Sequence, residues 1–218
     1  MNSTRPDPSS TTPTDTAGVT LAVLAGGRGS RMGAAKDRLV IAGKPVLVHL
    51  LDRLAHAGPK LLVAAADHPS PVGHERFDRI AFDAVAGTGP LAGVVAALAA
   101  ATTPRVYVLS VDMPNVGPEQ LAWLRDSLAA RGELTGLLCE RAGAGADAPP
   151  SVEPFPSIFR SSAASLLAAE LAAGRRALHS LLDLPAFGAA TVPSTWNGSV
   201  WLNLNRPDDL RRAGAIIL

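Results

Sequence analysis

The stretch VTLAVLAGGRGSRMGAAK, residues 19–36, joins a short apolar run to a loop rich in glycine and positive charge. The apolar run, residues 19–24, predicts a buried strand. Glycine lets the following backbone turn sharply, and consecutive N–H groups can then face an anion. Arg31 and Lys36 add positive charge to the same loop. The stretch fits a phosphate-binding loop and fits equally a plain strand-to-helix turn with two solvated cations.

The glycine spacing of this loop excludes two common phosphate-binding motifs. The loop holds no G-x-x-x-x-G-K-[ST] sequence, so it is not a P-loop. Gly27, Gly29 and Gly33 follow the spacing G-x-G-x-x-x-G, which is one residue longer than the dinucleotide fingerprint. The spacing therefore disfavours a nicotinamide-dependent dehydrogenase.

The first half of the chain alternates between strand and helix patterns. Strands are expected over residues 19–24, 60–65, 80–84 and 105–111, and helices over residues 44–57, 91–101 and 118–130. Short connections between these elements favour an α/β fold, with a mostly parallel sheet and helices on both faces. Ligands bind beyond the carboxyl ends of the strands in such sheets, which is where the glycine loop begins.

The second half of the chain has a less regular pattern. Strands are expected over residues 156–160 and 200–204, and another is expected to begin at Thr191 and Val192. Helices are expected over residues 162–173, 176–182 and 207–213. The chain shows no internal repeat, so one domain is expected over residues 19–218.

Composition and charge exclude several classes of partner. Apolar residues make up 47% of the chain but aromatic residues only 4%, so the core is expected to hold many small side chains. The longest apolar runs, such as residues 91–101, are well short of the roughly 20 residues of a membrane-spanning helix. The net charge is +1 and no basic stripe carries interleaved aromatics, so neither a nucleic acid nor a membrane is an expected partner.

Residues 1–18 are mostly Ser, Thr and Pro, which predicts a disordered tail. These residues have neither the apolar core of a secretory signal nor the pattern of a transit peptide, so a cytoplasmic protein is expected. Cys139 is the single cysteine, which rules out an intrachain disulfide. It stands in the apolar stretch LTGLLC, where a buried thiol is expected rather than a catalytic one.

An acidic residue directly follows the expected strand over residues 105–111. Asp112 belongs to the sequence SVDMP and is expected at the edge of the sheet where ligands bind. Mg²⁺ often takes only one or two carboxylates together with substrate phosphates and water. Asp112 is therefore a candidate Mg²⁺ ligand, and the alternative is an aspartate that caps the following turn.

A second glycine loop, GTGPLAG at residues 87–93, leads into the expected helix over residues 91–101. The N-terminus of that helix can face an anion or the edge of a base. Asp83 stands just before the loop. The alternative is a helix start whose glycines serve close packing.

Two asparagines alternate near the C-terminus, in the sequence WLNLN. Asn203 and Asn205 would point to the same side of the strand expected over residues 200–204. Two amides on one side could orient a polar substrate, and the alternative is amides that satisfy backbone groups at a strand end. None of the five histidines has the spacing of a metal motif such as H-E-x-x-H.

Four motifs occur in a fixed order: L-A-G-G-x-x-x-R-M-G-x-x-K, G-P-L-A-G, D-M-P and N-x-N-x-P-x-D-L. Together they resemble the molybdenum cofactor guanylyltransferases, the MobA type of nucleotidyltransferase. The first motif alone indicates only the wider nucleotidyltransferase superfamily. G-P-L-A-G and the asparagine motif narrow the resemblance to the guanylyltransferases. The resemblance covers residues 19–212.

The resemblance implies a Rossmann-like three-layer α/β/α domain that binds GTP and Mg²⁺. Such an enzyme transfers GMP to molybdopterin and releases pyrophosphate, and it contacts molybdoenzymes or other proteins of cofactor biosynthesis. By motif, Leu24, Ala25 and Gly26 would contact the nucleotide. Gly27 would shape the turn, and Lys36 would hold phosphate.

The later motifs carry the remaining implied roles. Asp83 would lie near the base or the ribose, and Asp112 would ligate Mg²⁺. Arg31, Asn203 and Asn205 would place the acceptor or the reacting phosphates. Arg31, Lys36 and Asp112 would form the catalytic set.

The chain departs from the family pattern at a few positions. Arg206 stands where the last motif of the family usually has Thr, and Ala64 stands where some members have a polar nucleotide contact. The identity of the nucleotide base and that of the acceptor therefore stay open. The alternatives are a related nucleotidyltransferase that uses CTP or another nucleotide with a different phosphorylated acceptor, and a catalytically inactive nucleotide-binding accessory protein.

Overall fold

The computed structural model describes residues 18–25, 39–66, 71–83, 89–143, 149–196, 198–205, 207–213 and 215–217. The expectation of a disordered tail lies outside these residues, except for Gly18. The expected phosphate loop also lies outside them, apart from its first residues, Leu24 and Ala25.

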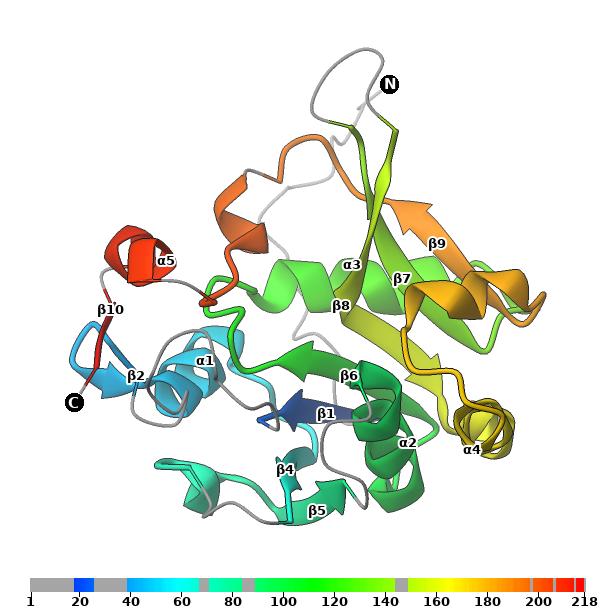
Figure 1. The fold of residues 1–218 in the computed structure, drawn as a ribbon, viewed down its shortest axis with the longest axis horizontal. Helices are drawn as coiled ribbons and strands as arrows, with labels where there is room; N and C mark the ends of the chain where they lie inside the picture. Colours follow the sequence, from blue (N-terminus) through cyan, green and yellow to red (C-terminus); the bar gives the residue numbers. More distant parts are fainter. Residues whose placement is uncertain are drawn as a thin grey trace, which may run out of the picture.

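The centre of the fold is a seven-stranded sheet with the order β5-β4-β1-β6-β8-β7-β9 (Figure 1). Its strands are β1 (Val19–Leu24), β4 (Lys60–Ala65), β5 (Arg79–Asp83), β6 (Arg105–Ser110), β7 (Gly136–Arg141), β8 (Ser151–Arg160) and β9 (Phe187–Thr191). All neighbours pair in parallel except at β8, which is antiparallel to both β6 and β7. The sheet is therefore mostly parallel, as the sequence predicts.

Helices cover both faces of this sheet. They are α1 (Val46–Leu54), α2 (Pro90–Ala100), α3 (Pro118–Ala129) and α4 (Ala164–Ala172), followed by α5 (Pro207–Ala213) near the C-terminus. Helix α2 packs on β4, β5 and β6 and contacts α4, whereas α3 packs on β7 and β8 (Figure 1). This arrangement is the Rossmann-like three-layer α/β/α fold in a single domain.

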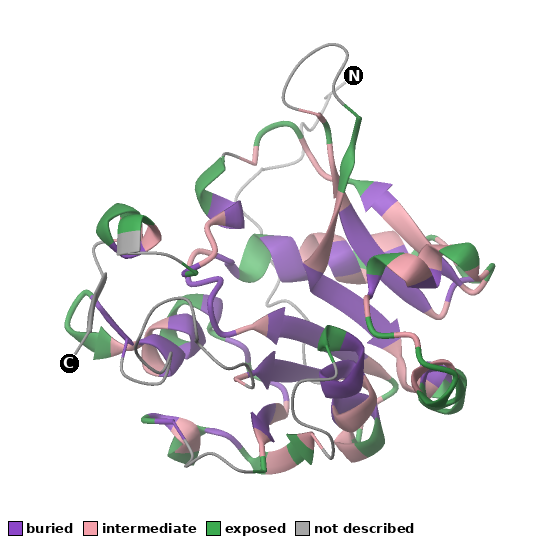
Figure 2. Cartoon of the chain, in the orientation of Figure 1, coloured by how far each residue is buried: buried purple, intermediate pink, exposed green. Residues whose placement is uncertain are grey.

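The central strands are buried because helices cover them on both sides. Every residue of β1 is buried, and so are the four central residues of β6. Continuous apolar runs of this kind are typical of strands in parallel sheets. Figure 2 shows the buried residues concentrated in the middle of the sheet and the exposed residues on outer surfaces such as that of α4. In the part of the chain that is described, no helix has the length and apolar character needed to cross a bilayer.

A small second sheet, with the order β10-β2-β3, was not predicted. Its strands are β2 (Leu39–Ile41), β3 (Lys44–Pro45) and β10 (Ala215–Ile217). Strand β10 pairs antiparallel with β2, so the C-terminal residues lie beside the segment that follows the glycine loop. Strands of two or three residues are too short to show a period in the sequence.

Several expectations for the second half of the chain are wrong. The strand expected over residues 200–204 is instead a 3-10 turn, Gly198–Trp201, followed by irregular backbone. Strand β9 ends at Thr191, where a strand was expected to begin, and the helix expected over residues 176–182 is a 3-10 segment, His179–Asp183. Such short elements are fixed by tertiary contacts more than by local pattern.

Candidate active site

The carboxyl ends of β1 and β6 lie side by side at the point where the strand order reverses. From β1 the chain continues to β4 and β5 on one side, and it returns to β6 on the other. Leu24 pairs with Ser110 in the register, and the Val111 N–H donates to the Leu24 carbonyl at 3.0 Å. Ligands of open α/β sheets bind at such switch points. The glycine loop and the loop after β6 therefore leave the sheet together.

Asp112 lies in the second of these loops and is 7% exposed. The Met113 N–H donates to the Ser110 carbonyl at 3.1 Å and closes a tight turn around the aspartate. The Leu204 N–H donates to the Asp112 carbonyl at 2.9 Å. This bond joins two motifs that are about ninety residues apart in the chain, and it brings Asn203 and Asn205 beside Asp112.

The two asparagines differ in their local structure. The Asn203 side-chain amide donates to the Trp201 carbonyl at 3.3 Å, and Asn203 is half-buried. Asn205 is exposed, and its backbone N–H lies 3.0 Å from the Asn203 carbonyl. Since the segment is not a strand, the strand alternation that was expected to align the two side chains does not apply. Their proximity to Asp112 comes instead from the Leu204 bond.

A third element, α1, supports the same loop. The Asn115 side-chain amide donates to the Ser199 carbonyl at 2.9 Å, and the Arg53 Nε–H donates to the Asn115 carbonyl at 3.1 Å. His49, one helical turn before Arg53, forms a hydrogen bond with the Pro114 backbone. Burial, followed by the positive charge of Arg53, lowers the pKa of His49. Its neutral form is therefore favoured near pH 7.

This supporting set was not predicted from the sequence. The signal available in the sequence was the spacing of His49 and Arg53, four residues apart, which places both side chains on one face of a helix. Nothing in the sequence indicated that this face meets the loop after Asp112.

All three tryptophans of the chain form a cluster beside the asparagine segment. The rings of Trp123 and Trp196 meet edge to face at 5.2 Å, and those of Trp196 and Trp201 lie 6.0 Å apart. The Arg141 guanidinium, at the carboxyl end of β7, lies 5.3 Å from the Trp201 ring centre. Aromatic pairs and cation–π contacts of this kind stabilise a packed arrangement. The cluster holds the irregular segment before Asn203 against α3 and β7.

The glycines before and within α2 serve close packing. Gly89 has φ +93°, and a Cβ there would lie 2.9 Å from the Arg176 carbonyl. The Leu91 N–H donates to that same carbonyl at 3.2 Å, so one N–H group of the helix start is already paired within the protein. A Cβ on Gly93 would approach the Leu24 side chain to 3.0 Å. The G-P-L-A-G motif thus fits α2 against the strand that leads into the glycine loop.

Asp83 stands at the end of β5, away from Asp112. It pairs with Ala65 in the register, and strands β4 and β1 lie between β5 and β6. Three strand spacings correspond to roughly 14 Å across the sheet. Asp83 and Asp112 therefore cannot share one metal ion, but both can reach a ligand of nucleotide length.

The remaining candidates, Gly26, Gly27, Arg31 and Lys36, lie outside the described residues. Within the described ranges, no three His, Cys, Asp or Glu side chains form a metal-binding group. Cys139 is fully buried, as expected, and burial raises the pKa of its thiol. A thiol in that position is not a nucleophile.

Comparisons with known proteins agree with this architecture. The family model of the MobA-like NTP transferase domain matches residues 21–193. The molybdenum cofactor guanylyltransferase of Burkholderia ambifaria is 34% identical over 163 residues, which cover 72% of this chain and 78% of the relative. That of Cereibacter sphaeroides is 32% identical over 202 residues, which cover 89% and 95%.

A solved structure extends the agreement to three dimensions. Molybdopterin-guanine dinucleotide biosynthesis protein A from Archaeoglobus fulgidus superposes with a TM-score of 0.71 at 25% identity, covering 89% of this chain and 96% of that one. The match to the family model includes β6 and most of β1, the strands that lead to the candidate site. The chain therefore belongs to the MobA-like NTP transferase family and is a nucleotidyltransferase.

Proposed function

We propose that this enzyme transfers GMP from GTP to molybdopterin and releases pyrophosphate, with Mg²⁺ at Asp112. The observation that carries the proposal is the meeting of three segments at the switch point of the sheet. The Val111–Leu24 and Leu204–Asp112 backbone bonds bring together the start of the glycine loop, the D-M-P turn and the asparagine motif. The relatives that match most of the chain are guanylyltransferases by name.

The nucleotide is assigned to the β1 side of this site. Leu24 and Ala25 continue into Gly26 and Gly27, whose backbone can lie close to a ligand because glycine has no Cβ. Lys36 supplies a positive charge for the phosphates. Asp83, at the end of β5, is far enough across the sheet to meet the ribose or the base.

Asp112 fits the requirements of a magnesium ligand. Asp112 lies in a tight turn at the end of a buried strand, and a hard cation prefers carboxylate oxygen donors. Mg²⁺ often takes only one or two carboxylates together with substrate phosphates and water, so a single aspartate can serve. When bound, Mg²⁺ supplies Lewis-acid stabilisation of charge on the phosphate oxygens.

The acceptor is assigned to the asparagine side. Asn203, Asn205 and Arg31 would orient the acceptor so that its phosphate oxygen attacks the α-phosphorus of GTP in line with the departing pyrophosphate. The P–O bond to the new phosphate forms as the bond to the β-phosphate breaks. A phosphate nucleophile is already ionised near pH 7, so the site needs positioning and charge stabilisation and no general base.

A panel of nucleotides tests this proposal against its alternatives. The purified protein is mixed with molybdopterin and GTP, CTP, ATP or UTP, with and without Mg²⁺, and pyrophosphate release is measured. We expect release with GTP that depends on both Mg²⁺ and molybdopterin. Preference for CTP would indicate a cytidylyltransferase. Turnover only with another phosphorylated acceptor would show that molybdopterin is not the substrate. Nucleotide binding without turnover would indicate an accessory protein.

A further inference from the structure

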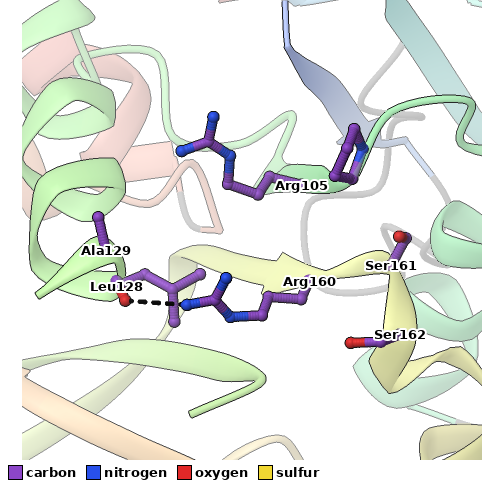
Figure 3. Close-up of a pocket in the computed structure, with 7 residues that line it drawn as sticks. Arg105, Leu128, Ala129, Arg160, Ser161 and Ser162 are labelled. Atoms are coloured by element: carbon purple, nitrogen blue, oxygen red, sulfur yellow. Dashed lines mark hydrogen bonds between the residues drawn. The ribbon is translucent and has the colours of Figure 1, made fainter. Parts of the chain in front are cut away.

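A cavity of about 420 Å³ lies at the end of β6 opposite to Asp112. Figure 3 shows the residues that line it, which come from the start of β6, the last turn of α3 and the junction between β8 and α4. They are Pro104, Arg105, Leu128, Ala129, Arg160, Ser161 and Ser162. From Arg105 to Asp112 the strand spans roughly 20 Å, so this cavity is separate from the candidate active site.

Two arginines form a cross-strand pair in this cavity. Strands β6 and β8 are antiparallel, and Arg105 is the direct register partner of Arg160. Directly opposed residues of antiparallel strands project from the same face of the sheet, with Cβ atoms about 5 Å apart. Figure 3 shows both side chains extending toward α3. Like charges in this arrangement destabilise a sheet unless something neutralises them.

No described residue supplies a negative charge that pairs with either arginine. Arg160 donates to the carbonyls of Leu134 at 2.8 Å and Leu128 at 3.4 Å, which are uncharged acceptors. Among the described residues, none accepts a hydrogen bond from the Arg105 side chain or forms an ion pair with it. None of the described residues that line the cavity is acidic. Asp126 on α3 pairs instead with Arg125, at 2.8 Å.

The geometry points to a binding site for the phosphate group of a small molecule. Guanidinium groups bind phosphate oxygens through paired, charge-assisted hydrogen bonds. The hydroxyls of Ser161 and Ser162, at the opposite wall in Figure 3, add further donors. The cavity falls in the size range of small-molecule sites, so there is room for an organic group beyond the phosphate. This inference does not depend on the proposed reaction.

Calorimetric titration of the full chain with inorganic phosphate tests the site. We compare the wild type with Arg105→Gln, which removes one charge of the pair, and with Ser162→Glu, which places a carboxylate at the wall. Ser162 is exposed, so its substitution leaves the fold intact even if the Arg105 variant does not fold. The matched control is Arg212→Gln, which removes an exposed charge on α5, outside the cavity.

We expect saturable binding to the wild type and to the Arg212 variant. The dissociation constant should rise at least about tenfold in both cavity variants, the scale of one lost charge-assisted hydrogen bond. Equal affinity in all variants would overturn the proposal, because phosphate would then bind elsewhere, for example at the glycine loop. Failure of the wild type to bind at millimolar phosphate would overturn it as well.

Ribose 5-phosphate and ribose distinguish the sources of the phosphate group. Tighter binding of ribose 5-phosphate than of inorganic phosphate would indicate a phosphorylated metabolite, and equal affinities would indicate phosphate itself. Both results require that the Arg105 and Ser162 variants lose the binding. Binding of unphosphorylated ribose with equal affinity would contradict a phosphate site.

Discussion

The two ends of strand β6 carry side chains of opposite charge, and these side chains have different surroundings. At the carboxyl end, Asp112 sits in a turn that is tied by backbone hydrogen bonds to β1 and to the segment before Asn205. At the amino end, Arg105 and Arg160 oppose each other across two strands beside an open cavity. Backbone hydrogen bonds fix the turn that carries Asp112, whereas the arginine pair lacks a charged partner among the described residues.

This difference shows which end of β6 has its geometry fixed by hydrogen bonds between distant segments. Around Asp112, segments that are distant in the chain converge because their backbone groups pair with one another, which fixes the backbone at Asp112. Around Arg105, the strand register sets the positions of the two side chains and leaves their charges to be balanced by something else. This contrast is the basis for the proposals that catalysis takes place at the first end and anion binding at the second.

Replacement of Asp112 should have the largest effect. Asp112→Asn keeps the size of the side chain but removes the charge that would hold Mg²⁺, so kcat should fall by at least about 10³-fold. Steady-state pyrophosphate release measures this, and thermal unfolding checks the fold. Asp126→Asn, which removes an exposed carboxylate of α3, is the control and should retain wild-type turnover. Near-normal activity of the Asp112 variant would contradict a catalytic role for the carboxyl end of β6.

Removal of the Lys36 charge should have the next largest effect. Lys36→Ala should lower the rate by about 10²-fold, the scale seen when a preorganised charge-stabilising group is lost. Lys44→Ala is the matched control, because Lys44 pairs with Asp52 on the surface at 2.6 Å. A loss under about threefold for Lys36→Ala would mean that Lys36 is only a surface charge.

Disruption of the α2 start should reduce stability. An alanine at Gly89 would need φ +93° and would approach the Arg176 carbonyl to 2.9 Å, so Gly89→Ala should cost about 1–3 kcal/mol. Gly132→Ala is the control, since a Cβ at that position meets nothing within 4 Å. Urea denaturation compares the two variants. Equal stability of both would show that the start of α2 tolerates a side chain against the Arg176 backbone.

A smaller effect should come from pH at the arginine end. His56 is buried, its Nε2 lies 3.0 Å from the Val19 carbonyl, and its ring meets Tyr107 edge to face at 6.0 Å. Burial is the main cause that lowers the pKa of His56 below its ordinary value of 6.5. The hydrogen bond to Val19 opposes this shift, and the charge of Lys60 adds to it. Below pH 6.5 the unfolded chain therefore binds a proton that the folded chain does not, and stability falls as the pH falls.

The variant His56→Gln isolates this contribution, because glutamine can still donate to the Val19 carbonyl but does not titrate. The free energy of unfolding should drop less for the variant than for the wild type between about pH 7.5 and about pH 5.5. Chemical denaturation at several pH values gives the comparison. Parallel pH curves for the two proteins would mean that His56 has an ordinary pKa.

Much of the first half of the fold was predictable because its signals are local. The strands over residues 19–24 and 60–65 were predicted with their observed bounds, and the helices after them are within a few residues. The continuous apolar run at β6 and the acidic residue after it identified the edge that carries Asp112. The spacing of apolar residues reveals such strands and helices in the sequence, because each element buries one face or both.

The second half was less predictable because its structure depends on distant partners. The segment before Asn203 lacks a regular period and is held by Trp123, Trp196 and Arg141. Likewise, the pairing of Arg105 with Arg160 follows from the antiparallel insertion of β8, which no pattern in the sequence specifies. The motifs thus supply candidate residues for the site, but tertiary contacts decide which of them meet.

The most direct test of the account follows the phosphorus atoms of GTP. The enzyme is incubated with molybdopterin, Mg²⁺ and GTP that carries ³²P at either the α or the γ position, and the products are separated. The account predicts that the α label moves to the pterin product and the γ label to pyrophosphate. Release of the γ label as inorganic phosphate, with no α label on the pterin, would contradict nucleotidyl transfer at Asp112.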